Sequence, residues 1–175
     1  MELRKKYKRQ QLELEWERIS GKIQKQSFPS GFGQYVLYIL GELFMNIIEH
    51  AEAQKIKLNI KVSKKKFHFS VSDDGKGIRK SYHKNELFPK DDKSAIEFAL
   101  GGLSSKSGKE RGFGFYSIRK LTEAINGNFS IASGNMEATI SKNSILYRRM
   151  NNTIPGVAVN INSPVMSIDF YNYIK

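Results

Sequence analysis

Apolar residues recur at helical spacing in three stretches of the chain, and each stretch predicts a helix. The first covers roughly residues 3–25, and its apolar side consists of Leu12, Trp16, Ile19 and Ile23. The second, which is the most apolar, covers about residues 34–53, and the third covers residues 113–125. Residues 28–33 contain proline and glycine, so a linker is expected between the first two helices.

Alternation of apolar and polar residues predicts strands in much of the remaining chain. Residues 55–62 and 66–72 alternate in this way, and the lysines between them complete the pattern of a β-hairpin. Three further strand-like runs follow later, over residues 128–132, 138–148 and 157–161. Residues 79–111 are polar and rich in glycine, with one short helix expected over 93–100. A segment of this length between regular elements is usually functional.

This order of elements predicts an α+β fold, a two-layer sandwich whose mixed, mostly antiparallel sheet has helices on one face. A length of 175 residues suits one domain with a core, and 39% hydrophobic with 26% charged residues is typical of a globular chain. We expect a basic amphipathic helix and linker over residues 1–30, the main domain over 31–165, and a tail over 166–175.

The formal net charge of +12 favours an acidic partner, such as nucleotide phosphates, an acidic protein surface or nucleic acid. Five of the basic residues cluster at the start of the chain: Arg4, Lys5, Lys6, Lys8 and Arg9. The alternative is a solvated surface that contains many lysines. Aromatic residues are sparse among the basic runs, where only Tyr7 and Phe67 occur, so charge alone supports nucleic acid.

Neither a membrane span nor a secretory signal is expected. The apolar run from Val36 to Leu40 is far too short to cross a bilayer. Residues 1–10 are basic, but no apolar segment of signal-peptide type follows them. The chain has no cysteine, which excludes disulfides and thiol chemistry and fits a reducing compartment. We therefore expect a cytoplasmic protein.

The second predicted helix carries a polar stripe made of Glu42, Asn46, Glu49 and His50. This stripe would be an ordinary solvent face, except that it holds no lysine or arginine and includes asparagine, which is a poor residue inside a helix. Glu42 and Asn46 lie one turn apart, so the first is placed to activate a hydroxyl and the second to offer an oxygen to Mg²⁺. His50 either orients a neighbouring glutamate or has a structural role.

The end of the hairpin reads Asp73-Asp74-Gly75-Lys76-Gly77-Ile78. An Asp-Gly pair is common in turns, so a simple turn is one interpretation. In the functional interpretation the two glycines let the backbone approach a flat ligand, while Asp74 accepts a hydrogen bond from an exocyclic amine such as that of adenine. The spacing of acidic residues does not fit an EF-hand calcium loop.

A third motif, Gly112-Phe113-Gly114-Phe115, opens the last predicted helix. Ser117 stands where a Rossmann fingerprint needs its third glycine, and Gly108-Lys109 lacks the surroundings of a P-loop. Glycines before a helix nevertheless expose backbone N–H groups to an anion. Further donors precede them at Ser104, Ser105, Lys106, Lys109 and Arg111. The lysines among these are equally explained as solvated loop charges.

With the three motifs in this order, residues 35–162 resemble the ATPase module of the GHKL (Bergerat-fold) family, which DNA gyrase, heat-shock chaperones, histidine kinases and mismatch-repair ATPases share. The resemblance implies ATP and Mg²⁺ as cofactors, with Glu42 as general base and Asn46 as metal ligand. Asp74 would read adenine, and Gly112 and Gly114 would hold phosphates. The implied nucleotide-binding set is completed by Glu49, His50, Gly75, Gly77, Ile78, Ser104, Ser105, Lys106, Arg111, Phe113 and Phe115.

Within this family the motifs are closest to anti-sigma serine kinases and to small bacterial ATPases found with STAS-like proteins. Histidine kinases usually carry Asn or His at the position of Glu42, and no histidine lies in the N-terminal helix to accept a phosphoryl group. The resemblance implies an Mg²⁺-dependent ATPase or serine/threonine kinase-like module that acts on a partner protein. A non-catalytic, ATP-dependent interaction switch is the alternative, and the N-terminal apolar stripe allows a homodimer. Phe115 departs from the leucine usual after the second glycine.

Overall fold

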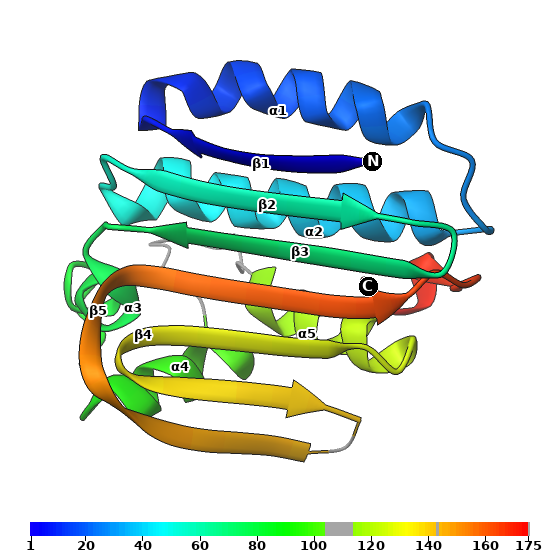
Figure 1. The fold of residues 1–175 in the computed structure, drawn as a ribbon. Helices are drawn as coiled ribbons and strands as arrows, with labels where there is room; N and C mark the ends of the chain where they lie inside the picture. Colours follow the sequence, from blue (N-terminus) through cyan, green and yellow to red (C-terminus); the bar gives the residue numbers. More distant parts are fainter. Residues whose placement is uncertain (104–113, 143, 175) are drawn as a thin grey trace.

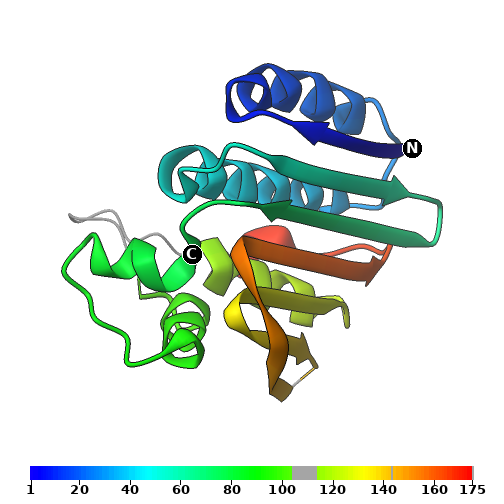
Figure 2. The same cartoon turned by 60° about the vertical axis from the view of Figure 1, so that its left-hand side comes forward.

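The computed structural model describes residues 1–103, 114–142 and 144–174 of the chain. Its centre is a five-stranded antiparallel sheet in the order β1-β2-β3-β5-β4 (Figure 1). The strands are β1 (Glu2–Tyr7), β2 (Ile56–Val62), β3 (Lys66–Asp73), β4 (Asn128–Ser141) and β5 (Ser144–Pro164). All described helices lie on one face of this sheet, as the turned view in Figure 2 makes clear. The predicted two-layer α+β fold is confirmed, with every described strand pair antiparallel.

The helical layer is built around one long helix. This is α2 (Phe32–Asn46), which continues without a break into a π-helical turn, η1 (Ile47–Ala51). The other described helices are α1 (Arg9–Gln24), α3 (Gly77–His83), α4 (Asp92–Leu100), α5 (Gly114–Ala124) and a short 3₁₀ turn, η2 (Phe170–Asn172). Helices α1, α2, α4 and α5 correspond to the three long helices and the short one expected from periodicity, whereas α3 and η2 were not expected.

The core lies between the two layers. Period-two alternation puts Ile56, Leu58 and Ile60 of β2 on the helix side, and all three are buried. Phe67 and Phe69 of β3 lie on the same side and are also buried. Because α2 is apolar over most of its surface, it fits between these strands and α1. The opposite face of the sheet carries no described helix (Figure 1), and it is polar over β1, β2 and β3.

Two predictions of secondary structure are wrong, one at the N-terminal end of the chain and one at the start of the long polar segment. Residues 2–7 form strand β1, not the start of a helix, and pair with β2 from Glu2↔Lys61 to Tyr7↔Ile56. The amphipathic helix therefore begins only at Arg9. Helix α3 (Gly77–His83), which begins in the predicted turn and runs into the polar segment, was not expected. Ile78 and Tyr82, one turn apart on its inner side, are both buried.

The C-terminal strands are also longer than predicted. A single strand was expected over residues 138–148, whereas β4 ends at Ser141 and β5 begins at Ser144, so this region is a hairpin. The two strands pair along most of their length, with register shifts at Gly134. Among the described residues no helix is both long and apolar enough to cross a membrane.

Candidate functional site

A cavity of about 210 Å³ opens on the helical side of the sheet. Its walls come from α2 and η1, the strands β3 and β5, helices α3 and α4, and the first turn of α5. Three elements that are distant in the sequence therefore meet here. These are the polar stripe of the second helix, the end of the first hairpin and the start of α5, which holds Gly114 and Phe115 of the third motif.

Glu42 and Asn46 lie one turn apart on the wall formed by α2. Both side chains reach Gly114, the first residue of α5. A Cβ added there would lie 2.8 Å from Glu42 Oε2 and 3.4 Å from Asn46 Nδ2. Glycine at this position thus leaves room for both polar groups beside the helix start. Asn46 Nδ2 is buried and has no hydrogen-bond partner among the described residues, so its amide is placed to meet a ligand.

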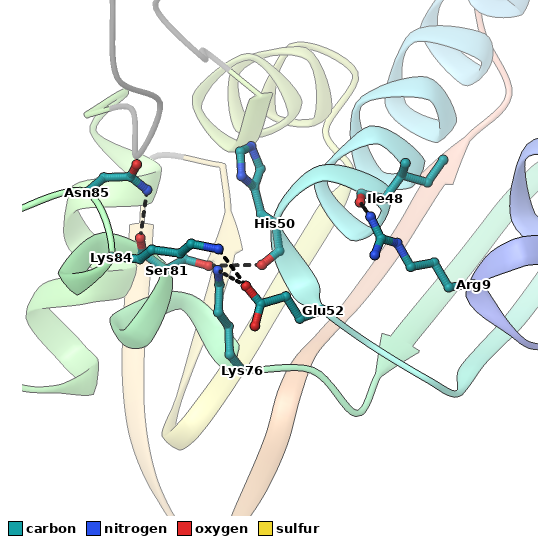
Figure 3. Close-up of polar contacts among 8 residues, drawn as sticks. All are labelled: Arg9, Ile48, His50, Glu52, Lys76, Ser81, Lys84 and Asn85. Carbon is teal, nitrogen blue, oxygen red and sulfur yellow. Dashed lines mark hydrogen bonds and ion pairs between the residues drawn. The ribbon is translucent and has the colours of Figure 1, made fainter.

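The polar stripe continues into η1, where Glu49 and His50 also line the cavity. Glu49 Oε2 and His50 Nε2 are 3.4 Å apart. Side chains from two other helices donate hydrogen bonds to backbone carbonyls of this π-helical turn (Figure 3). The guanidinium of Arg9, at the start of α1, donates to the carbonyl of Ile48. Ser81 Oγ of α3 donates to the carbonyl of His50 at 3.4 Å, so the turn is held from both sides.

Ion pairs also hold the end of this turn. Glu52 follows η1 in a left-handed conformation, with φ of 54°. Its Oε1 lies 2.8 Å from Lys84 Nζ and 3.1 Å from Lys76 Nζ (Figure 3). Hydrogen bonds from these two lysines lower the pKa of Glu52 to about 2. The end of the long helix is thereby tied to the glycine-containing turn and to the end of α3.

The two aspartates at the end of β3 have opposite surroundings, and Asp73, not the predicted Asp74, lies at the cavity. Asp73 lines the cavity and is 9% exposed. Asp74 does not line it; its Oδ1 accepts hydrogen bonds from the backbone N–H groups of Gln54 and Lys55, both at 2.8 Å. Successive side chains of a strand point to opposite faces, and Asp73 shares the face of Phe69 and Val71. That alternation was the signal that sequence reasoning overlooked.

Burial raises the pKa of Asp73 to about 6, against its usual value of 3.8. Two backbone N–H groups oppose this shift: that of Gly75, 2.9 Å from Oδ1, and that of Val157. The carboxylate is consequently anchored on one side and faces the apolar cavity on the other. In such a place, an ionised Asp73 is an acceptor for a ligand N–H group.

Close backbone packing holds this corner of the cavity. Ser133 Oγ accepts a hydrogen bond from Ile78 N and donates one to the Gly156 carbonyl, both at 3.0 Å. Gly77 and Gly156 have positive φ values of 77° and 67°, a conformation that favours glycine. A Cβ on Gly156 would collide with Asp73 itself. Strand β5 therefore approaches the aspartate closely enough for Val157 to contribute its N–H group.

The remaining predicted residues divide into three groups. Gly77, Ile78, Gly114 and Phe115 line the cavity. Gly75 does not; its missing side chain lets the turn pack against the carbonyl of Ala51. Ser104, Ser105, Lys106, Arg111, Gly112 and Phe113 lie outside the described residues.

Sequence reasoning missed most of the apolar wall. Val71 of β3 and Val157 and Val159 of β5 form the sheet side of the cavity, and Tyr82 and Leu103 form part of the opposite side. Tyr82 Oη donates to the carbonyl of Leu103, which links α3 to the segment after α4. The alternation in β3 and β5 was visible in the sequence, but the position of Tyr82 follows only from the fold of α3 across the cavity.

The donor set is compatible with a magnesium ion that is shared with a phosphate ligand. No group of three or more acidic or histidine side chains that could hold a metal occurs within the described ranges. Mg²⁺ is commonly bound through one or two protein oxygens, with phosphate and water oxygens completing its shell. Asn46, whose Nδ2 has no hydrogen-bond partner among the described residues, and the adjacent Glu42 carboxylate fit this arrangement when the Asn46 amide is turned so that its oxygen faces the cavity.

Comparison with known families identifies the family of the chain. The family model described as histidine kinase-, DNA gyrase B- and HSP90-like ATPase matches residues 33–148. This range exceeds half of the 175-residue chain, and the chain therefore belongs to this family of ATP-binding ATPase and kinase-like modules. No curated protein matches the chain.

Proposed function

We propose that the chain binds Mg²⁺·ATP in the cavity, with adenine against Asp73 and the phosphates near Glu42, Asn46 and Gly114. The observation that carries this proposal is the pair of polar corners within one largely apolar cavity. One corner holds a buried carboxylate that accepts N–H groups, and the other holds a carboxylate beside an unpartnered amide. Val71, Val157 and Val159 supply an apolar wall on which a flat base packs.

Glu42 acts in this mechanism as the general base. Its carboxylate accepts the proton of a water or of a partner's serine or threonine hydroxyl while that oxygen attacks the γ-phosphorus and ADP leaves. Asn46 would hold Mg²⁺, and the bound ion would neutralise charge on the phosphate oxygens. Gly114 and Phe115, at the start of α5, line the same cavity, and the N-terminal end of a helix favours an anion. Direct phosphate contacts from Ser104, Ser105, Lys106, Arg111, Gly112 and Phe113 remain predictions.

The biological role that best fits the motifs is regulatory. The resemblance to anti-sigma serine kinases and to ATPases found with STAS-like proteins supports transfer of the phosphoryl group to a partner protein. The rival role is a non-catalytic switch, in which bound ATP creates a docking surface for such a partner. Turnover separates the two, because a switch needs ATP binding and no hydrolysis or transfer.

Replacing Glu42 with Gln tests the catalytic assignment. The substitution keeps the size and hydrogen-bonding capacity of the side chain but removes the base. We expect turnover of Mg²⁺·ATP to fall by about 10²–10⁴-fold while ADP affinity stays within about threefold of wild type. Phosphate release and calorimetric titration measure the two quantities.

Glu49→Gln is the matched control, because Glu49 lines the same cavity two turns further along. It is expected to retain at least about a tenth of wild-type turnover. Equal turnover by wild type and Glu42→Gln would remove Glu42 from this role. A wild-type protein that binds ATP, shows no turnover and retains a partner only in the ATP-bound state would favour the switch.

A further inference from the structure

The helix-free face of the sheet is strongly basic over β1, β2 and β3, on the side that faces the viewer in Figure 1. The strand register places five cationic residues on this side, opposite the buried core residues: Arg4, Lys6, Lys57, Lys61 and Lys66. All five are exposed. Glu2 is the one carboxylate at the outward positions of these three strands, and its Oε1 pairs with Lys61 Nζ at 2.8 Å. We call these outward positions the outer face.

The neutral residues of the outer face are all polar. They are Asn59 on β2 and His68, Ser70 and Ser72 on β3. Protein–protein interfaces have apolar and aromatic residues at their centre, and unpaired bases bind by stacking on aromatic rings. The outer face has no aliphatic side chain and no Phe, Tyr or Trp. Lysine, arginine, serine and asparagine are, in contrast, the usual partners of nucleic-acid phosphates.

The charge of the whole chain is unevenly placed. It carries 29 basic and 17 acidic residues, yet the outer face has five cations to one carboxylate. Strands rise by about 3.3 Å per residue, so Lys57 and Lys61 lie roughly 13 Å apart along β2. A duplex carries one negative charge per ~1.7 Å of its axis, and 13 Å therefore presents about eight phosphates. The density of cations suits several simultaneous phosphate contacts.

We propose that the outer face binds the phosphate backbone of double-stranded nucleic acid without reading its sequence. On the next strand, β5, Asn160 pairs with Ser70 and Asn162 pairs with His68. These two asparagines continue the polar surface from β3 onto β5. The nucleotide cavity lies on the other side of the sheet, since Val71 and Asp73 face the helices. Both sites are accessible at once, and loss of one leaves the other measurable.

The test is fluorescence anisotropy with a labelled duplex of mixed sequence at several KCl concentrations. If four to five cations each contact a phosphate, log Kobs against log[KCl] has a slope of about −4. Combined Arg4→Ala, Lys6→Ala, Lys57→Ala and Lys66→Ala should make the slope shallower by about 3–4 and weaken binding at low salt. The milder pair Lys6→Gln and Lys57→Gln should change the slope by about 2. DNA and RNA duplexes are compared in parallel.

The matched control removes the same charge from the helical side of the molecule. It combines Lys22→Ala, Lys25→Ala, Lys80→Ala and Lys90→Ala, all of which are exposed. Its slope should stay within about one unit of wild type, and all variants should bind Mg²⁺·ADP as wild type does. Equal effects of the two sets would overturn the proposal, as would the absence of duplex binding. Tighter binding of poly-glutamate or of a single strand than of the duplex would also overturn it.

Discussion

At the scale of single residues, Asp73 and Asp74 show how one position along a strand changes the chemistry of a carboxylate. Asp73 faces the cavity, and burial raises its pKa to about 6. Asp74 is exposed, and hydrogen bonds from backbone N–H groups, that of Lys55 first, lower its pKa below the usual value. Asp74 therefore anchors the backbone of its own turn, whereas Asp73 is available to a ligand in the cavity.

Because an ionised Asp73 is buried at a cost, Asp73→Asn should stabilise the free protein. The folded-state pKa of about 6 lies above the ordinary value of 3.8. Wild type therefore loses stability relative to the variant as pH rises from about 4 to 6, and the full difference is present above pH 6. We expect the variant to gain up to about 3 kcal/mol at pH 7.5 and only about 0.5 kcal/mol at pH 4, because each pH unit between the two pKa values corresponds to about 1.4 kcal/mol. Urea unfolding at the two pH values measures this, and a pH-independent difference would contradict it.

At the scale of elements, the π-helical turn η1 is positioned by its neighbours. Arg9 of α1 and Ser81 of α3 bind its carbonyls, and Glu52 pairs with Lys76 and Lys84 just beyond it. π-helical turns within α-helices are frequent at functional sites. Here the turn carries Glu49 and His50 to the cavity wall, and it is held there by Arg9 from α1 and by Ser81, which also lines the cavity.

Removing the charge of Glu52 should loosen α3. In Glu52→Gln we expect faster amide hydrogen exchange in Gly77–His83 and no change in Gly114–Ala124. Glu13→Gln, on the exposed side of α1, is the control. Because the folded pKa of Glu52 is lowered to about 2 from 4.5, its contribution is present above about pH 4.5 and is lost as pH falls toward 2. Exchange that accelerates equally in both helices would contradict a local role.

Elements with strong local patterns could be predicted from the sequence, and elements formed by distant pairing could not. The β2–β3 hairpin and α2 have clear periodicity. Strand β1 is an edge strand rich in lysine, a composition that protects an exposed edge but resembles a charged helix start. Its identity depends on pairing with β2, whose partner residues lie 49 (Tyr7↔Ile56) to 59 (Glu2↔Lys61) positions away in the sequence. The site motifs were visible individually, whereas the apolar wall from β5 and the position of Tyr82 required the fold.

At the scale of the whole molecule, the N-terminal segment is integrated with the rest of the described structure. Strand β1 extends the sheet, and α1 packs against α2 through Trp16. The ring of Trp16 meets Phe44 edge-on, with centroids 5.5 Å apart. The Trp16 ring also packs near Gly41, the neighbour of Glu42: a Cβ added at Gly41 would lie 3.6 Å from the ring. The sequence predicts a division at about residue 30 between an N-terminal segment and the main domain, and the contact of α1 with α2 crosses this division.

The single tryptophan makes this integration measurable. We expect the fluorescence of Trp16 and the far-ultraviolet circular dichroism to report the same unfolding midpoint in urea. Coincident transitions are the signature of one cooperative unit. A fluorescence transition at distinctly lower urea would show that residues 1–30 unfold separately, as the division predicted from the sequence implies.

The central claim is that Asp73 holds the base of a nucleotide in the cavity, and calorimetric titration with Mg²⁺·ADP tests it most directly. Loss of a hydrogen bond to a charged group costs roughly 1.5–3 kcal/mol, so Asp73→Asn should weaken binding about ten- to hundredfold. Asp74→Asn is the control, because that carboxylate lies outside the cavity, and it should bind as wild type does. Equal affinity of wild type and Asp73→Asn, or a loss confined to Asp74→Asn, would contradict this account of the site.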